Sequence, residues 1–546
     1  MKLATHGRMS AALVGLWIGA GVAMVAGATA GTLYIVGALE DNAGPDTLVV
    51  ALPTFGTDVL DPSMDGQNGQ TYYGHLYDRL LGAGSDGSVD ADRGALEGWT
   101  GSADAMSYTL RLRRGMKWHD GLEVTAKDLK FSLEHYARQA AACASCGSIL
   151  WVAREIRVIG PYSVEVALKE PDVNFIARLG PEWEDVPLLP RKYLEKVGAE
   201  VFAEAPVGTG PWKFSGREPG EFIEFEANLD YWDPERIPGF QRLRLIRVPE
   251  LEKRMALLRT GAVDMTPVAP EDIEPLKTEG FAIQGPKYVI ETTLRFFMSY
   301  DPQFLAASLE FRTALNLGID RASIVERVYP PEAAALIGGS PMFSPLIEGY
   351  DPALPPYPYD AELARQLLRE AGYDGETVHL LSQPTYGLTE VPLVNNMVAE
   401  DWRQIGVDVE IVEYSNYGPV KIMYTARPQR FDDLAPAPVF SGGHVDRPGG
   451  IVNSLHRYLA GSDLGLLSYH DLDTGQRIYY ELVAMQKGER REQRLVELNR
   501  QLYEEYWAIP LMWRHDVWAL RSGLSEWSPT NGTLSDLHFE TVRLVD

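Results

Sequence analysis

Hydrophobic residues recur along the chain at two spacings, which predict alternating strands and helices. Between positions 107 and 112 every second residue is apolar, the pattern of a half-buried strand. From 129 to 137 the apolar residues follow helical spacing, and Thr125 with Asp128 forms an acidic variant of a capping box at the start of that helix. The intervening turn contains Lys117, His119 and the strong turn dipeptide Asp120-Gly121. This polar cluster is therefore predicted to be scaffold and not a catalytic site.

The same two spacings predict elements in the rest of the chain. They are a strand at 48–52, a helix at 73–80, a hairpin at 154–171, a helix at 250–260, a helical stretch at 308–329 broken at Gly318, a helix at 359–372, and strands at 377–382 and 407–415 around a helix at 393–406. A strand, helix and strand in succession are typical of a mixed α/β lobe. Because a single domain rarely exceeds about 250 residues, a chain of 546 residues is expected to form two or three lobes.

The N-terminus predicts export. Lys2 and Arg8 precede an uncharged run from 9 to 39, and Ala28-Thr29-Ala30 resembles a signal cleavage site. The run also exceeds the roughly 20 residues that span a bilayer. Residues 1–45 are therefore either a signal peptide or an N-terminal membrane anchor, and both place the remainder in a periplasmic or extracytoplasmic compartment.

Charge and composition exclude several classes of function. The chain has 76 acidic and 50 basic residues, a net charge of −26, which disfavours a nucleic-acid partner. Cys143 and Cys146 are predicted to form a local disulfide after export, with free thiols and a redox or metal site as alternatives. The segment "GTGPWK" lacks phosphate-loop spacing, and no nucleophile accompanies His119. We predict no catalytic residue, no metal site and no cofactor.

Several motifs, in one order, carry a family resemblance. They are "EGWTGSADAMSYTLRLRRGMKWHDGLEVTAKDLKFSLEHY", "PVGTGPWKF", "NLDYWDP", "KRMALLRTGAVDM", "FRTALNLGIDRASIVERVY" and "YDAELARQLLREAGY". The chain resembles the extracytoplasmic solute-binding proteins of ABC importers, family 5, the dipeptide, oligopeptide and nickel-binding group. The resemblance implies an α/β, two-lobed periplasmic-binding-protein fold of the large type. Lobe I would comprise 46–298, with an inserted subdomain at about 76–203, lobe II would comprise 299–509, and 510–546 would return to lobe I through a hinge.

The resemblance also implies ligand-binding residues. Peptide binders of the family share a segment W-x-x-D-x-x-D-P, in which the tryptophan lines the cleft and the first aspartate anchors the amino group of the peptide. The matching stretch here is "FSGGHVDRP", in which Phe440 replaces the tryptophan, Gly443 replaces the anchoring aspartate and Asp446 matches the second aspartate. Ser441 and His444 lie in the same stretch. Because a glycine cannot pair with an ammonium group, a simple peptide is disfavoured relative to a ligand without a free amine.

Further candidates follow from position alone, since residues just past strand ends commonly face clefts. Thr54 and Phe55 follow the first strand, Tyr386 follows the strand at 377–382, and Trp513 and His515 lie near the expected return crossing. Each could equally be a packing residue.

We therefore expect a monomeric, non-enzymatic binding protein that captures a peptide, an amino-acid conjugate or an oligosaccharide. It would deliver this ligand to an ABC permease and its ATPase. The alternatives are a sensor or chaperone-like binder without transport, which a retained anchor would favour, and a cell-envelope hydrolase, for which the sequence offers no clustered nucleophile and base.

Overall fold

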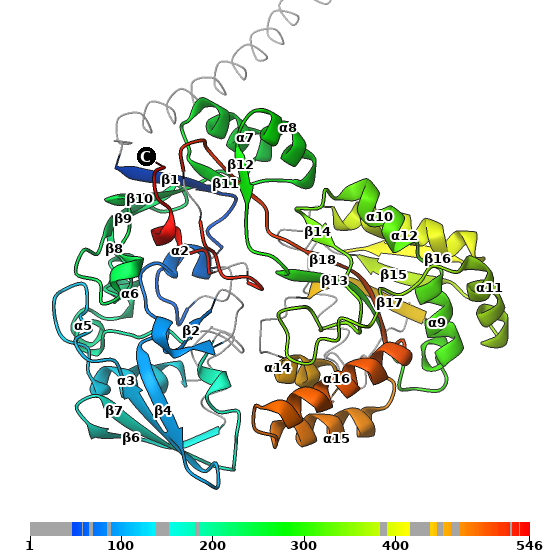
Figure 1. The fold of residues 1–546 in the computed structure, drawn as a ribbon, viewed down its shortest axis with the longest axis horizontal. Coiled ribbons are helices and arrows are strands. Elements are labelled where there is room, and N and C mark those ends of the chain that lie inside the picture. Colours follow the sequence, from blue (N-terminus) through cyan, green and yellow to red (C-terminus); the bar gives the residue numbers. More distant parts are fainter. Residues whose placement is uncertain are drawn as a thin grey trace, which may run out of the picture.

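The computed structural model describes residues 46–56, 58–64, 69–84, 89–137, 152–180, 186–382, 390–414, 437–444, 451–459, 469–524, 527–533 and 536–545. The predicted signal or anchor segment, Cys143, Cys146, Tyr386 and Asp446 lie outside these residues. Figure 1 shows two lobes side by side, with the first half of the chain in one and most of the second half in the other. Within the described ranges, no helix has the length and apolar character needed to cross a membrane.

Lobe I is built on a seven-stranded sheet with the order β12-β19-β11-β1-β10-β9-β8. Its strands are β1 (Thr47–Leu52), β8 (Trp212–Glu218), β9 (Phe222–Ala227), β10 (Arg242–Arg247), β11 (Met265–Pro267), β12 (Ala282–Gln284) and β19 (Trp518–Leu520). The apolar run of β1 is buried over its whole length because parallel neighbours, β10 and β11, flank it on both sides. Helices α7 (Leu251–Thr260) and α8 (Ile273–Thr278) lie at the top of this lobe in Figure 1, beside β11 and β12.

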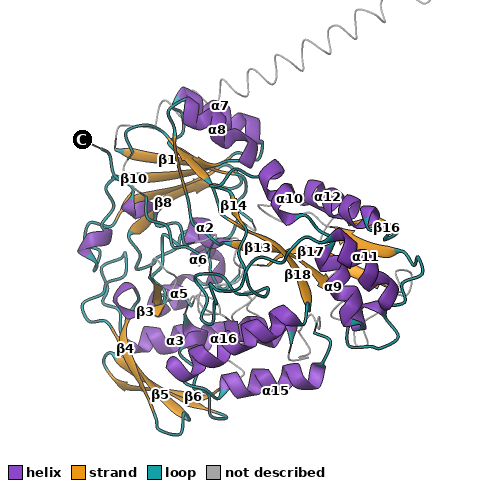
Figure 2. Ribbon diagram, turned by 45° about the vertical axis from the view of Figure 1, so that its right-hand side comes forward, coloured by secondary structure: helices purple, strands orange, loops and turns teal. Residues whose placement is uncertain are grey.

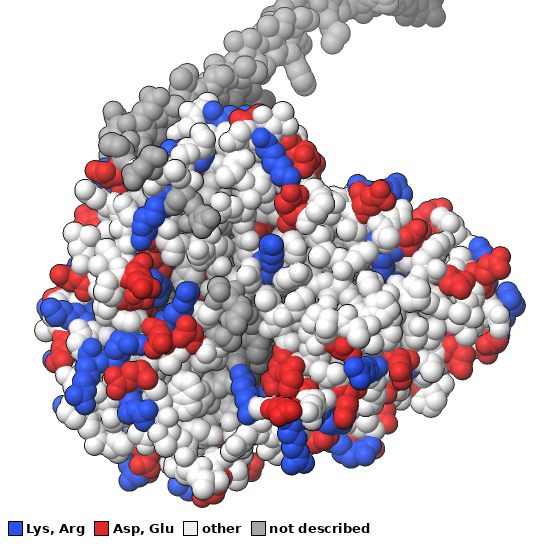
Figure 3. Space-filling view, viewed as in Figure 1, with Lys and Arg blue, Asp and Glu red and all other residues white. Residues whose placement is uncertain are grey.

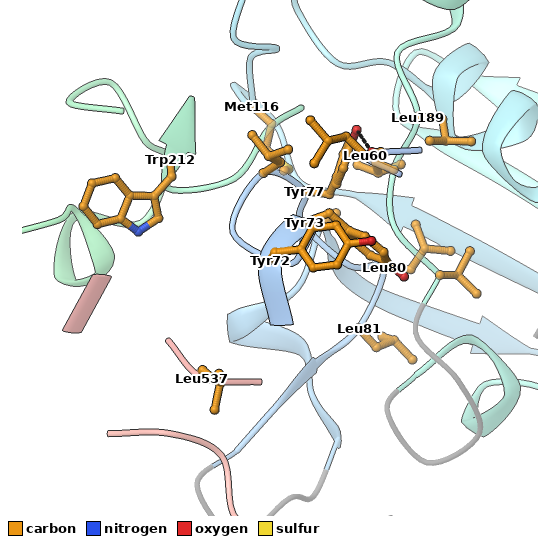
Figure 4. Packing of buried hydrophobic residues seen from close by; sticks show 14 of the residues in the cluster. Leu60, Tyr72, Tyr73, Tyr77, Leu80, Leu81, Met116, Leu189, Trp212 and Leu537 are labelled. Atoms are coloured by element: carbon orange, nitrogen blue, oxygen red, sulfur yellow. Dashed lines mark hydrogen bonds between the residues drawn. The ribbon is translucent and has the colours of Figure 1, made fainter. Parts of the chain in front are cut away.

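A four-stranded antiparallel sheet forms the lower part of lobe I, with the order β4-β5-β7-β6. The strands of this sheet are β4 (Leu96–Gly101), β5 (Ser107–Leu112), β6 (Ala153–Gly160) and β7 (Ser163–Leu168). The same part of lobe I contains the helices α3 (Ala126–Tyr136), α5 (Arg191–Val197) and α6 (Ala199–Glu204). One apolar cluster joins this sheet to β1 and its neighbours, so the insertion shares the core of lobe I. Figure 4 shows part of that cluster, including Tyr72, Tyr77, Met116 and Leu189.

Lobe II is built on a six-stranded sheet with the order β14-β18-β13-β17-β15-β16. Its strands are β13 (Ile290–Phe296), β14 (Ala334–Ala335), β15 (Val378–Ser382), β16 (Val409–Glu413), β17 (Ala437–His444) and β18 (Ala508–Arg514). One face packs on α9 (Leu309–Leu317), α10 (Arg321–Val328), α11 (Ala361–Glu370) and α12 (Val391–Gln404). The other face packs on α14 (Ile451–Tyr458), α15 (Leu472–Val483) and α16 (Glu489–Glu504).

The chain passes between the two main sheets at 285–289 and again at 515–517. Strands β13 and β18 both belong to the sheet of lobe II. The boundaries expected from the sequence, at 298 and 510, therefore differ by one strand from these crossings. The reason is that β13 and β18 are paired antiparallel neighbours within the sheet of lobe II, and their local sequence pattern does not show to which sheet they belong.

Most predicted elements are confirmed. Strand β5 buries Tyr108, Leu110 and Leu112, and α3 begins at the capping box, where the Asp128 carboxylate accepts from the Thr125 amide at 2.9 Å. The predicted helix at 73–80 is wrong, because α2 covers only Gln70–Tyr73. Beyond it the backbone bonds to other loops, with the Leu76 carbonyl accepting from the Gly210 amide and the Leu80 amide donating to the Val186 carbonyl.

Candidate functional site

The carboxyl ends of the parallel strands in both lobes lie on the side where the chain crosses. In lobe I, β11 ends at Pro267, whose partner is Trp518, the first residue after the second crossing. In lobe II, β17 ends at His444, whose partner is Glu291, immediately after the first crossing. Open α/β sheets bind ligands outside the carboxyl ends of their strands. Both sheets therefore present their binding edges to the space between the lobes.

Two crossing segments pack against each other at one end of this space. The Asp516 amide donates to the Pro286 carbonyl at 3.0 Å, and His515 Nδ1 accepts from the Tyr288 amide at 3.0 Å. A Cβ at Gly285 would lie 1.9 Å from the Asp516 carbonyl oxygen, so only glycine permits this approach. Burial raises the pKa of Asp516 to about 6 and lowers the pKa of His515 to about 4.

A second contact joins the lobes far from the crossings. Asn174, in the loop between β7 and α5, donates through Nδ2 to the Val483 carbonyl at the end of α15 at 2.7 Å. Its Oδ1 accepts from Arg491 Nη1 of α16 at 2.5 Å, and Arg491 also pairs with Glu348 at 3.1 Å. Asn174 is 6% exposed and Arg491 is 1% exposed. We call Asn174, Val483 and Arg491 the clasp; Figure 2 shows α15 and α16 alongside the lower part of lobe I that carries it.

The space between the lobes thus has a covalent crossing at one end and the clasp at the other. In the space-filling view, the outline of the molecule is notched between the lobes, and charged side chains of both signs stand along their boundary (Figure 3). A small cavity beside Glu291, Ser340, Tyr357 and Trp513 offers about 10 Å³ to the centre of a water, which is room for about one water molecule. A ligand of peptide size does not fit in this cavity.

The described sequence-predicted candidates in lobe II lie on strands of its sheet. Trp513 lies on β18 opposite Glu291 and is 3% exposed. The backbones of Phe440, Ser441 and His444 lie on β17, paired with β13. Their roles in ligand binding stay predictions.

Thr54 and Phe55 are occupied by contacts within lobe I. Thr54 Oγ1 accepts from the Gly56 amide at 2.9 Å, which closes a local turn. The Phe55 ring is 1% exposed and packs on Tyr72 with ring centroids 5.7 Å apart. In this conformation the Phe55 ring offers almost no surface to a ligand.

The polar cluster around His119 is structural. His119 Nδ1 accepts from the Gly208 amide at 3.2 Å, and its Nε2 donates to the Gly210 carbonyl at 3.0 Å. Burial lowers the pKa of His119 to about 4, so the ring is neutral and both of its nitrogens hydrogen-bond to the loop that contains Gly208 and Gly210. A Cβ at Gly208 would lie 1.8 Å from the Leu76 carbonyl oxygen, which explains why this loop contains glycine. The two sequence motifs "WHDG" and "GTGPW" are therefore parts of one joint.

A second charged cluster fixes the C-terminal segment to lobe I. Arg236 binds Glu540 through Nη2 at 2.6 Å, Arg79 binds Asp536 at 2.9 Å, and His538 lies between Asp536 and Glu540. Although burial alone would lower it, the two carboxylates raise the pKa of His538. Since these positive and negative charges pair with one another, the cluster is explained by docking of the terminus.

Sequence reasoning missed a row of polar side chains on β13. Glu291, Thr293 and Arg295 alternate along the strand, a pattern that predicts a solvent face, yet they are 1%, 0% and 2% exposed. Glu291 Oε2 accepts from the Met342 amide at 3.0 Å, and Thr293 Oγ1 donates to the Ile509 carbonyl at 3.1 Å. Arg295 lies over the Tyr458 ring at 4.0 Å. Alternation alone could not reveal that α14–α16 cover this face.

No group of three or more histidine, cysteine, aspartate or glutamate side chains is placed to hold a metal ion in the part of the chain that the structure describes. The pKa shifts of His119, Asp516 and His538 are explained by the joint, the crossing and the docked terminus.

Comparison with known proteins identifies relatives of this fold. The family profile described as "Bacterial extracellular solute-binding proteins, family 5 Middle" matches residues 93–433. Heme-binding protein A of Haemophilus influenzae is 28% identical over 364 residues, which are 62% of this chain and 64% of that protein. Di/tripeptide-binding protein 1 of Pseudomonas aeruginosa is 26% identical over 59% of this chain and 63% of its own length. These alignments thus span less than two thirds of either relative.

A solved structure resembles the fold over nearly its whole length. The periplasmic binding protein DppA of Helicobacter pylori, solved with the peptide STSA, superposes with a TM-score of 0.72 at 21% identity, and the match covers 92% of this chain and 98% of that one. The two-lobed architecture predicted from the sequence is confirmed.

Proposed function

The chain belongs to family 5 of the bacterial extracellular solute-binding proteins, and on this premise we propose that it captures a small polar ligand between its lobes for an ABC importer. The observation that carries the proposal is the shared orientation of the two main sheets, which direct the carboxyl ends of their parallel strands at the interlobe space. Binding there makes and breaks no covalent bond in the ligand.

Closure of the lobes couples binding to delivery. A ligand that contacts both sheets binds the closed form better than the open form, and so it shifts the population toward closure. The crossings at 285–289 and 515–517 serve as the hinge, and the clasp forms when the lobes meet. A permease in the membrane, coupled to its ATPase, receives the ligand from the closed protein.

The ligand is a peptide or an amino-acid conjugate. This assignment is supported by the di/tripeptide-binding relative and by the peptide-bound structural neighbour. Glycine at position 443 removes the carboxylate that would anchor a free amino group, which favours a ligand recognised through other groups. The protein acts as a monomer outside the cytoplasm, after export directed by residues 1–45.

A thermal-shift screen of the purified mature protein tests the proposal. The screen uses the twenty Ala-X dipeptides, each in free, N-acetylated and C-amidated form, together with glutathione and maltotriose. A ligand present at 100 times its dissociation constant stabilises the folded state by about 2.7 kcal/mol. If no compound raises the melting temperature and calorimetry detects no binding, the proposed peptide-type function is wrong. Hydrolysis of any compound during the assay would instead favour an enzyme.

A further inference from the structure

Arg295 is a buried cation, and two of its three guanidinium nitrogens have no hydrogen-bond acceptor among the described residues. It lies on β13, in the middle of the lobe II sheet, and is 2% exposed. Its guanidinium carbon lies 4.0 Å from the centroid of the Tyr458 ring on α14. Its Nε and Nη2 atoms are fully covered, and no described oxygen accepts from them. A ring face attracts the cation but does not replace these hydrogen bonds.

The other buried arginines of the described ranges each have at least one such partner, although Arg244, Arg254, Arg491 and Arg514 also have covered nitrogens without a hydrogen bond. Each binds a carboxylate, a side-chain amide or main-chain carbonyls, and they are Arg244, Arg254, Arg312, Arg321, Arg491 and Arg514. Arg312, for example, donates to the Ala306 and Ala307 carbonyls, both at 2.9 Å. A buried charge left without such partners is strongly destabilising, so a guanidinium retained in this state requires an explanation.

The position of Arg295 supplies that explanation. Its partner across the ladder is Phe440 on β17, and the neighbouring pair toward the binding edge on the same face is Thr293 with Gly442. Between the guanidinium and the edge of the sheet, Gly442 contributes no side chain and Thr293 contributes only a small one. The Tyr458 ring lies against the guanidinium, whose planar fork suits a two-pronged acceptor such as a carboxylate.

We propose that Arg295 binds a carboxylate of the ligand, so that the transported solute is an acidic molecule held by its negative group. This proposal rests on the proposed function and names the ligand class for the same site. It also accounts for Gly443, because recognition through a carboxylate needs no partner for a free amine. Within a peptide-type ligand the carboxylate can be the C-terminal group or an acidic side chain.

The experiment compares wild type with Arg295→Met and Arg295→Lys, by calorimetry, on the dipeptide panel and glutathione. N-acetylated dipeptides are expected to bind as well as free ones. Amidation removes the C-terminal carboxylate and should therefore abolish binding. The exceptions are the dipeptides in which X is Asp or Glu, whose side-chain carboxylate remains to bind Arg295. Arg295→Met should weaken binding by about 10- to 100-fold, which corresponds to the loss of a charge-assisted hydrogen bond. The affinity of Arg295→Lys should lie between those of wild type and Arg295→Met, because lysine keeps the charge but cannot bind a carboxylate through two parallel hydrogen bonds.

A second readout requires no ligand. Because Arg295→Met removes an unpaired buried charge, the melting temperature of the ligand-free protein is expected to stay equal or rise. A fall of several degrees would mean that Arg295 pairs inside the protein, which would overturn the proposal. Equal binding of carboxylated compounds by wild type and Arg295→Met would overturn it as well. Absence of any binding to wild type would contradict the proposed function, while the melting temperatures would still decide the state of Arg295.

Discussion

Substitution of Asn174 by alanine tests whether the clasp holds the lobes closed. The side chain lies in the first lobe, and both of its polar atoms bind the second, Nδ2 to the Val483 carbonyl at 2.7 Å and Oδ1 to Arg491 at 2.5 Å. The loop that presents it is fixed within lobe I, since the Asp172 carboxylate accepts from the Asn174 amide at 2.9 Å and binds Arg178. Asn174→Ala therefore removes the cross-lobe bonds and leaves the loop intact.

The expected magnitude follows from the two bonds. One joins neutral groups and contributes about 1 kcal/mol, and the other involves the Arg491 cation and contributes about 1.5 kcal/mol or more. Arg491 keeps Glu348 as its partner at 3.1 Å, which limits the loss. A closed form destabilised by about 2 kcal/mol relative to the open form weakens a ligand that requires closure by roughly 30-fold.

Calorimetry on wild type and Asn174→Ala gives the two dissociation constants, and small-angle X-ray scattering of the ligand-free proteins gives their radii of gyration. Gln493→Ala is the matched control, since Gln493 lies on α16, is exposed and bonds only within its helix, to Glu489. We expect weaker binding and a larger radius for Asn174→Ala alone. Unchanged affinity together with an unchanged scattering curve would refute the clasp as a closing contact.

Three further substitutions test the physical account of the scaffold. Gly208→Ala places a Cβ 1.8 Å from a carbonyl oxygen and should lower the free energy of unfolding in urea by more than about 3 kcal/mol. Gly216→Ala is the control, because its Cβ meets no atom within contact distance, and it should lower the free energy of unfolding little. Equal losses of stability in the two variants would contradict the close-packing argument. Burial lowers the pKa of His119 to about 4, whereas the same group in the unfolded chain takes up a proton near pH 6.5. The free energy of unfolding of wild type should therefore fall by up to about 3 kcal/mol between pH 7 and pH 4 because of this group. His119→Gln should lose less stability over that range. Burial raises the pKa of Asp516 to about 6, so the stability that this carboxyl group contributes falls as the pH rises from about 4 to 6. At pH 8, Asp516→Asn should therefore be more stable than wild type by up to about 3 kcal/mol. A variant less stable than wild type would refute the assignment.

Local patterns predicted most of the fold because they reflect local physics. The capping box at Thr125 and the alternation in β5 are decided by hydrogen bonds and burial within a few residues, and the structure has both. The helix expected at 73–80 failed because its backbone groups bond to the loop around Gly210, more than a hundred residues away. The spacing of apolar residues carries no information about hydrogen bonds to such a distant segment.

The binding edge was harder to predict for the same reason. Trp513 was predicted because it lies near the expected return crossing, and its role in ligand binding stays a prediction. Glu291 and Arg295 were not singled out, since their alternation with apolar residues resembles an exposed strand face. Only the packing of α14–α16 on that face turns Arg295 into a buried cation. Phe55 shows the converse, because a position past a strand end became a core residue through its contact with Tyr72.

The most direct test of the account is the distance between the lobes with and without ligand. Spin labels at Leu229→Cys in lobe I and Tyr480→Cys in lobe II occupy positions that are 71% and 63% exposed, in a background with both native cysteines replaced by serine. Double electron–electron resonance is measured on the free protein and at saturation with the tightest-binding member of the panel. The account predicts that ligand narrows the distance distribution and shifts it to shorter values. An identical distribution in both samples, at proven saturation, would contradict closure of the two lobes on the ligand.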